Sequence, residues 1–440
     1  MFVHEMSSFV YIFAKHVIRP VAVVSGAEVK SALAIEMDGI LAKTQALLGN
    51  YLETQGHSVA IKLLDKNPCQ MGDMLVKSKA DSELLLNEQA LIAASKLWPL
   101  PISAIVSCGS SANVWLDRTV AFRAALTLQE WTGHQRPLNV QKVYVEEPTT
   151  NEYDTISMTE FRANVLRSTI KKCFQHGGYT LVENADLLDN DIPSDVMHVK
   201  IVHQRSKSTP QPQVEVLCGV VLTGLETQNA AQYIQLRADD MHLTALHRYG
   251  LRLPDASKLR ALVTSLGRSA AIVDMLQTKH TNVIDMRTRE EIMRNHCTSK
   301  GASFILYNYA RLATILNKHA KLVEQGLAPD LPPIHEIDFS LLIEPEEWQL
   351  LYAYLLRFPD TVRLTIGYGK SPQIAPYHML NFTLCMIKCL SKYYRRVRIL
   401  TDNRPRLQPV MSARLCLIRA VFDMLKVILD IFDLEPVEEM

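Results

Sequence analysis

The chain has 440 residues, too many for one ordinary domain, and its length predicts roughly two to four domains that each bury a core. Hydrophobic residues make up 48% and charged residues 21%, a balance that excludes disordered and coiled-coil proteins. Lys and Arg number 47 against 46 Asp and Glu, so the formal net charge is +1. Taken alone, this near-neutrality argues against a protein that binds polyanions through bulk charge.

The N-terminal region contains a short apolar run, Phe9 to Ala14, with Glu5 before it and Lys15 after it. A secretory signal has its positive charge first and a longer apolar core, so we expect no such signal here. The longest uncharged stretch, 97–116, contains prolines and polar residues, and we expect no membrane span. Eight scattered cysteines without short paired spacings are typical of a reducing compartment, which predicts a cytoplasmic protein.

In chain order, the first half has a mixed pattern. Helical spacing covers Asp81 to Lys96 and Thr159 to Phe174, and strand patterns cover 103–107 and 140–145. The polar, proline-containing stretch Ser206 to Gln213 is the best linker candidate. We therefore predict a mixed α/β region at residues 1–205, followed by a linker and connecting segment at 206–254. The sequence leaves open whether the first region retains a Rossmann-like sheet.

From residue 255 to residue 440 the pattern predicts an all-α helical bundle. Four apolar residues at four-three-four spacing indicate an amphipathic helix that begins near Ser303, and Pro345 begins another helix. A third helix follows Pro376, with Leu380, Leu384 and Ile387 along one face. The last helix has a broad apolar arc, for which Ser412 is the expected N-cap.

Nucleotide-binding motifs are weak in this chain. The stretch Val106 to Ser111 follows a predicted strand but has one glycine, where a dinucleotide or S-adenosylmethionine loop has two or three. The stretch Gly367 to Lys370 lacks the spacing of a P-loop. Both stretches fit a turn better than a nucleotide-binding loop.

The charges are distributed unevenly. Residues 388–419 contain nine basic residues and one acidic residue, whereas residues 144–195 contain ten acidic and four basic residues. At about 100° per residue, Lys388, Lys392, Arg395 and Arg396 lie on one side of their helix. Two tyrosines, 393 and 394, fall within this cluster, and an exposed tyrosine beside an arginine suits stacking on RNA bases. A solvated basic face with no ligand explains the same pattern, and the charges alone do not separate the two.

Several segments resemble arginyl-tRNA synthetases in the order those enzymes have them. Phe304 to Arg311 looks like the Tyr-x-Gln-Tyr-Ala-x-Ala-Arg helix that begins their DALR anticodon-binding domain, although Leu306 replaces the usual glutamine. Trp348 to Pro359 is similar to the family's leucine-rich helix, and Pro376 to Leu380 to its Pro-His-x-Leu helix start. Ala413 to Met440 resembles the last helix and Pro-x-x-Met tail. The resemblance covers about residues 255–440.

The first half lacks the catalytic signatures of class I synthetases. Neither the His-x-Gly-His turn, which steadies ATP phosphates in the transition state, nor the Lys-Met-Ser-Lys-Ser loop is present. The chain is therefore identified as resembling the DALR anticodon-binding domain-containing protein 3 family, whose members are synthetase-like proteins without catalytic signatures. That resemblance implies a tRNA-recognition partner of a 3-methylcytidine methyltransferase, which selects certain arginine tRNAs for modification of an anticodon-loop cytidine.

The resemblance also implies how this chain would use its residues. We expect phosphate contacts from Lys388, Lys392, Arg395, Arg396, Arg414 and Arg419, and contacts nearer to the bases from Arg311 and Tyr393. The α/β half would dock the methyltransferase, and no cofactor is expected in this chain because S-adenosylmethionine belongs to the partner. Two alternatives stay open: a divergent arginyl-tRNA synthetase, and a structural subunit that no longer binds RNA. Arg414 and Arg419 lie on such an apolar helix that either could instead stabilise the bundle.

Overall fold

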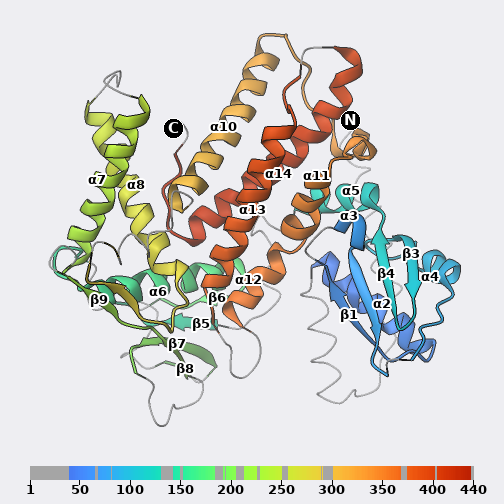
Figure 1. Cartoon of the computed structure of the whole chain (residues 1–440), viewed down its shortest axis with the longest axis horizontal. Helices are drawn as coiled ribbons and strands as arrows, with labels where there is room; N and C mark the ends of the chain where they lie inside the picture. Colours follow the sequence, from blue (N-terminus) through green and yellow to red (C-terminus); the bar gives the residue numbers. More distant parts are fainter. Residues whose placement is uncertain are drawn as a thin grey trace, which may run out of the picture. The chain divides into compact units, whose positions relative to one another are not determined.

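The computed structural model describes residues 39–64, 68–80, 82–129, 142–148, 152–183, 192–193, 195–204, 213–224, 228–249, 256–288, 290, 301–367, 374–401 and 404–437. The expectations for Phe9 to Ala14, for the linker and for the Gly367 turn lie wholly or largely outside these residues. Residues 39–440 pack as one compact unit. Figure 1 shows this unit, with many of its helices and strands labelled.

The first sheet is antiparallel and has the strand order β1-β2-β4-β3. Its strands are β1 (Val59–Leu63), β2 (Met74–Ser78), β3 (Ile102–Cys108) and β4 (Ser111–Leu116). The helices of this region are α2 (Ile40–Thr54), α3 (Pro68–Met71), α4 (Glu88–Ser95) and α5 (Arg118–Leu128). The helix expected from residue 81 begins instead at Glu88, because the Asn87 side chain caps it by accepting from the Ala90 N–H at 3.1 Å.

The single-glycine stretch from Val106 to Ser111 forms a hairpin between β3 and β4. Gly109 has φ +58, a left-handed conformation that glycine adopts without steric cost, and the two strands pair antiparallel on either side of it. A nucleotide loop of this type connects a strand to a helix, so this stretch is a turn, as expected.

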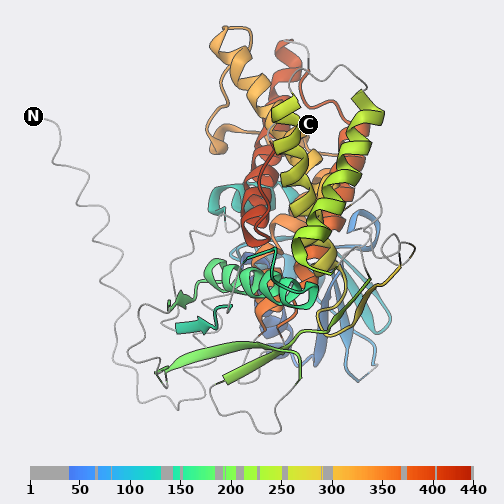
Figure 2. The same cartoon turned by 90° about the vertical axis from the view of Figure 1, so that its left-hand side faces the viewer.

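The second sheet is parallel and has the order β6-β5-β7-β8. Its strands are β5 (Lys142–Val145), β6 (Thr180–Leu181), β7 (Val196–Val202) and β8 (Gln213–Leu217). Helix α6 (Met158–His176) connects β5 to β6, and Ser157 with Glu160 forms a capping box at its start. Figure 2 shows α6 in green over one face of this sheet. The strand order reverses at β5, as in Rossmann-like sheets, so the sequence's open question is answered in favour of such a sheet.

Arg162 holds the loops beside this sheet. Its side chain is fully buried and donates to the carbonyl oxygens of Gly219 (2.9 Å), Asn282 (2.6 Å), Lys279 (3.0 Å) and Thr278 (3.3 Å). These carbonyls flank the two-stranded parallel sheet of β9 (Val221–Thr223) and β10 (Ile284–Met286). One guanidinium therefore ties α6 to the end of α8 (Ala256–Gln277) and to both flanking loops.

The segment expected as a linker and connection, 206–254, contains β8, β9 and α7 (Ala230–Tyr249). Helix α7 packs closely against α8: a Cβ at Gly267 would lie 2.7 Å from the Ala238 Cα, so only glycine allows this approach. Between the two helices, the buried Asp274 binds Arg237 at 2.9 Å and accepts from the Tyr233 hydroxyl at 3.0 Å. This pairing crosses the boundary expected at residue 255.

The C-terminal region is helical, as predicted. It contains α10 (Ala302–Glu324), α11 (Pro345–Gln349), the π-helix η7 (Leu350–Leu355), α12 (Phe358–Ile366), α13 (Tyr377–Arg396) and α14 (Gln408–Ile431), with short 3-10 turns at Ile334–Glu336, Phe339–Leu341 and Pro405–Leu407. Helices α10, α13 and α14 lie side by side in Figure 1, and α10 packs against both α13 and α14. The expectation that Ser412 caps the last helix is wrong: α14 begins at Gln408 with Pro409 in its first turn, and Ser412 is buried inside it.

Asp73 joins the first sheet to the helical region. Its buried carboxylate accepts from the Trp348 indole N–H at 2.8 Å and from the Leu116 N–H at 2.8 Å, and its carbonyl accepts from the Tyr352 hydroxyl. Phe122 of α5 packs edge-on against the Trp348 ring at 5.9 Å between centroids. Burial raises the pKa of Asp73 to about 6, while the Leu116 and Trp348 hydrogen bonds and the Arg118 charge oppose that rise.

This pKa predicts a stability that depends on pH. The folded state binds the Asp73 proton more tightly than the unfolded state does. The contribution of Asp73 to the free energy of unfolding is therefore fully present below about pH 4 and is lost as the pH rises through about 6. We expect the stability of the wild type relative to Asp73→Asn to fall by roughly 2–3 kcal/mol between about pH 4 and about pH 7. Urea unfolding of both proteins across that range measures it, and a difference that does not change with pH contradicts the raised pKa.

Candidate nucleic-acid interface

A hollow of about 620 Å³ lies between α10 and the C-terminal end of α13. Helix α10 supplies one wall, and the last turn of α13 with the extended residues after it supplies the other. The lining residues are Tyr307, Ala310, Arg311, Thr314, Ile315, Lys318 and 394–400. Five of these are basic (Arg311, Lys318, Arg395, Arg396 and Arg398), and none of the described lining residues is acidic. The hollow is therefore suited to an anion.

Arg311 is stacked on a tyrosine at the wall of this hollow. Its guanidinium carbon lies 3.3 Å from the centroid of the Tyr394 ring and 5.7 Å from that of Tyr307, and its N–H is 3.5 Å from the Tyr307 hydroxyl. Such a cation–π contact holds the planar guanidinium in one orientation. Single-stranded RNA bases stack on tyrosine rings and on arginine planes, so these side chains form a suitable platform for an unpaired base.

Arg395 and Lys318 provide uncompensated charge at this hollow. Arg395 is exposed in the last turn of α13, where a cation also complements the helix dipole, and its Nε–H donates to the Ser391 carbonyl at 3.3 Å. Neither Arg395 nor Lys318 has a carboxylate partner among the described residues. Both are therefore available to phosphate.

Tyr393 is not where the sequence suggested. We expected it near RNA bases, but its ring is fully buried and its hydroxyl donates to the Glu347 carboxylate at 2.8 Å. That expectation is wrong, because the buried Glu347 needs internal hydrogen-bond donors and the Tyr393 hydroxyl is one of them.

Arg414 is a second donor to Glu347: its Nε–H donates to that carboxylate at 2.9 Å, and only 15% of its side chain is exposed. The sequence had left open that Arg414 stabilises the bundle, and the structure places it in that position.

Lys392 and Arg396 are exposed but bind an internal carboxylate. Lys392 Nζ lies 2.8 Å from Glu346 Oε1, and Arg396 lies 2.7 and 3.0 Å from the two Glu346 oxygens. Lys388 and Arg419 are exposed on α13 and α14 and lie outside the residues that line the hollow. Their phosphate contacts, like those of Lys392 and Arg396, stay predictions.

Sequence reasoning missed Lys318 and Tyr307 as members of this surface, and Arg398 and Tyr394 entered it only as residues within the basic segment 388–419. A signal for Lys318 was present, because residues 311, 314 and 318 share one stripe of a helix and all three line the hollow. The second wall, 397–400, has no helical spacing that would have placed it beside α10. Only the folded chain brings the two walls together.

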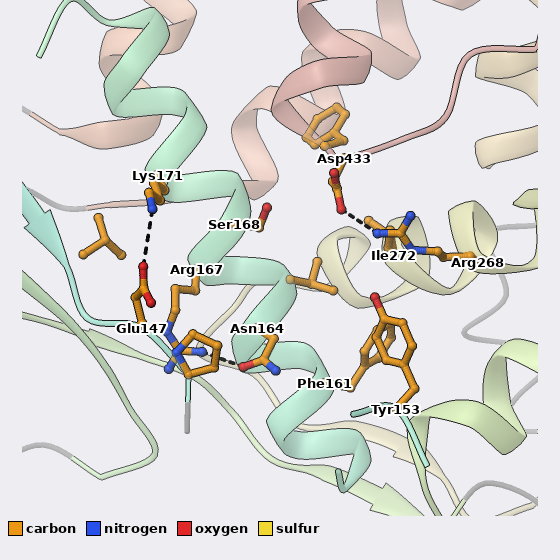
Figure 3. A pocket seen from close by; sticks show the side chains of 14 residues that line it. Glu147, Tyr153, Phe161, Asn164, Arg167, Ser168, Lys171, Arg268, Ile272 and Asp433 are labelled. Atoms are coloured by element: carbon orange, nitrogen blue, oxygen red, sulfur yellow. Dashed lines mark hydrogen bonds and ion pairs between the residues drawn. The ribbon is translucent and has the colours of Figure 1, made fainter. Parts of the chain in front are cut away.

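A second hollow, of about 460 Å³, lies at the carboxyl end of β5, where the strand order of the parallel sheet reverses. Figure 3 shows its polar side chains, many of which bind one another. Lys171 lies 3.7 Å from Glu147, Arg167 donates to the Asn164 oxygen at 2.6 Å, and Arg268 lies 2.6 Å from Asp433. Sheets of this type bind nucleotides at such a point. None of the described residues that line this hollow is a histidine.

Comparison with known proteins identifies the helical region. Residues 305–440 match the DALR anticodon binding domain. The chain is 31% identical over 231 residues to "DALR anticodon-binding domain-containing protein 3" of Danio rerio (51% of this chain, 41% of that protein) and 30% identical over 243 residues to the Mus musculus protein of that name (52% and 44%). The matched region thus spans less than half the length of these curated relatives.

Synthetases are also similar. The chain is 24% identical over 202 residues to "Arginine–tRNA ligase" of Levilactobacillus brevis, which covers 46% of this chain and 31% of that enzyme. The solved Thermus thermophilus arginyl-tRNA synthetase superposes with a TM-score of 0.61 at 12% identity, covering 90% of this chain and 100% of that chain. The Plasmodium falciparum arginyl-tRNA synthetase superposes with a TM-score of 0.57 at 10% identity, covering 95% and 100%. At these identities the likeness shows a shared fold.

In the part of the chain that the structure describes, no helix is long and apolar enough to cross a bilayer. The resemblance stated from the sequence is confirmed by the relatives and by the matched domain. Residues 305–440 therefore match the DALR anticodon binding domain, and the chain is similar to DALR anticodon-binding domain-containing protein 3.

Proposed function

We propose that this chain is a non-catalytic tRNA-binding adaptor that recognises certain arginine tRNAs and supports 3-methylcytidine formation in their anticodon loop by a partner methyltransferase. The observation that carries the RNA-binding part is the basic hollow between α10 and α13, which lies within the DALR anticodon binding domain. Its cations and stacked aromatic rings are the two kinds of group that bind an unpaired nucleotide.

In this proposal the hollow receives nucleotides of the anticodon loop. Arg395 and Lys318 contact phosphates, and the Arg311–Tyr394 stack contacts a base. Phosphate contacts position the RNA on the domain, whereas base contacts supply identity. A stem alone lacks unstacked bases, so the proposal requires a loop or a single strand.

The non-catalytic part rests on the missing His-x-Gly-His and Lys-Met-Ser-Lys-Ser signatures. In the second hollow, Arg268 and Lys171 already bind the chain's own carboxylates, which reduces the charge available to ATP phosphates. S-adenosylmethionine would then belong to the methyltransferase, which we place against the α/β region within residues 1–205.

A divergent arginyl-tRNA synthetase is the second candidate. A parallel sheet with a hollow at its switch point favours it, as does the shared fold. Arginine-dependent ATP–pyrophosphate exchange by the purified chain separates the two candidates. The adaptor predicts none, and clear exchange contradicts it.

The adaptor itself is tested by purifying the tagged chain from cells and identifying its bound tRNAs and proteins together. We expect arginine tRNAs enriched over other tRNAs, and a methyltransferase in the same fraction. If a protein partner is recovered without any enriched tRNA, the chain is a structural subunit. If tRNA is recovered without a methyltransferase, the result supports RNA binding by this chain and contradicts its role in methylation.

A further inference from the structure

We propose that the buried Glu346 neutralises Lys392 and Arg396 and thereby directs RNA phosphates to the hollow side of α13. The inference rests on the proposed function, because it assigns which part of the basic surface meets RNA. Four basic side chains project from the exposed part of α13 within three turns: Lys388, Lys392, Arg395 and Arg396. The structure divides three of these cations into two electrostatically different groups: Lys392 and Arg396, which bind a buried carboxylate, and Arg395, which has no carboxylate partner among the described residues.

The first group, Lys392 and Arg396, binds the carboxylate of Glu346. This carboxylate is 1% exposed and accepts from Lys392 at 2.8 Å and from Arg396 at 2.7 and 3.0 Å. The side chains of Lys392 and Arg396 are 63% and 51% exposed, so solvent reaches the cations while the anion stays covered. Burial acts against ionisation of Glu346, but the hydrogen bond and charge of Lys392 and the charge of Arg396 together hold its pKa below the usual value. The carboxylate is therefore charged at neutral pH.

Further acidic residues stand beside Glu346. Glu344 lies 3.5 Å from Arg396, and Glu347 binds Arg414 at 2.9 Å. All three glutamates belong to the cap and first turn of α11, where acidic side chains complement the helix dipole. Three cations here, Lys392, Arg396 and Arg414, thus face three anions. A phosphate that approached Lys392 would meet little net charge, because attraction to the cation and repulsion from Glu346 nearly cancel beyond contact distance.

The second group is Arg395 with Lys318 and Arg311, which line the hollow; Arg396 also lines it, but its guanidinium is bound to Glu346. Arg395 is bonded only to a backbone carbonyl among the described residues, and Lys318 and Arg311 face it without a carboxylate between them. Arg395 and Lys392 are three residues apart and both exposed on α13, so the sequence alone predicts a phosphate contact for each. The difference between them comes from α11, and it makes Glu346 a residue that determines where RNA lies.

Matched substitutions at those two positions test the inference on the full chain. We expect Arg395→Gln to weaken binding of an arginine tRNA transcript about fivefold or more and to reduce its salt slope by about 1. Lys392→Gln removes the same charge from the same helix and should change affinity less than about twofold, with an unchanged salt slope. Equal losses from the two substitutions would overturn the inference.

Glu346→Gln provides the converse test. The glutamine oxygen still accepts a hydrogen bond, but the charge that opposes phosphate is gone. We expect single-stranded oligouridylate to bind at least about threefold more tightly at low salt. The slope of log affinity against log salt concentration should become steeper by about 0.7 for each added phosphate contact. In the Glu346→Gln background, Lys392→Gln should abolish that gain. Weaker binding by a folded Glu346→Gln protein would show that Glu346 only orders the cations, and would reject the inference.

The outcomes separate this inference from the proposed function. If wild-type protein binds neither the tRNA transcript nor oligouridylate, the proposed function fails. If wild-type protein binds tRNA and the Arg395 and Lys392 variants behave alike, only the role of Glu346 fails. Circular dichroism and thermal unfolding of each variant exclude loss of the fold as the cause.

Discussion

Replacing Arg311 and Arg395 together by glutamate is expected to weaken tRNA binding by about 100-fold or more at moderate salt, with the fold intact. Arg311 is the guanidinium stacked on Tyr394, and Arg395 is a cation of the facing wall without a carboxylate partner among the described residues. Each substitution removes an attraction to the RNA and adds a repulsion in its place. The slope of affinity against salt should also fall by about 1–2, because fewer counterions leave the RNA on binding.

The matched control is Lys62→Glu with Lys96→Glu. Both lysines are exposed in the first α/β region, and the pair changes the net charge of the chain by the same amount. We expect its tRNA affinity to stay within about threefold of the wild type, since distant surface charges are screened at moderate salt. Electrophoretic mobility shift or fluorescence anisotropy at several salt concentrations measures both proteins. Equal losses of affinity in the two double variants would mean that RNA binding depends on the net charge of the chain and not on the hollow.

The second large effect concerns stability. Arg162→Met is expected to lower the free energy of unfolding by about 3–5 kcal/mol, because it removes a fully buried guanidinium that donates to four part-buried carbonyl groups. Two of those carbonyls, of Thr278 and Lys279, directly follow α8, so the end of that helix loses its partners. Arg162→Lys keeps the charge but cannot reach several carbonyls at once, and its loss should be intermediate.

Urea denaturation followed by circular dichroism measures these losses. Arg123→Met serves as the control, since Arg123 is an exposed arginine on α5, and its substitution should change the unfolding free energy by less than about 0.5 kcal/mol. If Arg162→Met proves no more costly than Arg123→Met, then the loops around β9 and β10 are held by other contacts and the guanidinium is dispensable.

Much of the fold was predictable from local patterns. The apolar stripes of α10, α13 and α14 and the strand pattern of β3 depend on neighbours a few residues away, and the structure has these elements where the sequence placed them. The start of α14 was misjudged because Ser412 is a good cap by type, whereas Pro409 is already in the first turn of the helix.

The sequence predicted which segment of the chain contributes to the site, but not which side chains of that segment face it. The sequence located a basic cluster in residues 388–419, and one wall of the hollow comes from that stretch. It could not separate Tyr393 from Tyr394, because adjacent helix positions differ by about 100° and the outcome depends on what packs against each side. Tyr393 faces the buried Glu347, and Tyr394 faces Arg311 of another helix.

Composition and periodicity by themselves predicted an α/β first half, a helical second half and a charge balance near zero that hides a basic C-terminal segment. The tertiary structure alone decided which of those basic side chains bind an internal carboxylate. Glu346 and Arg396 are 50 residues apart in the chain and 2.7 Å apart in the fold. Electrostatic interaction depends on distance in space, so its outcome is set only once the helices have packed.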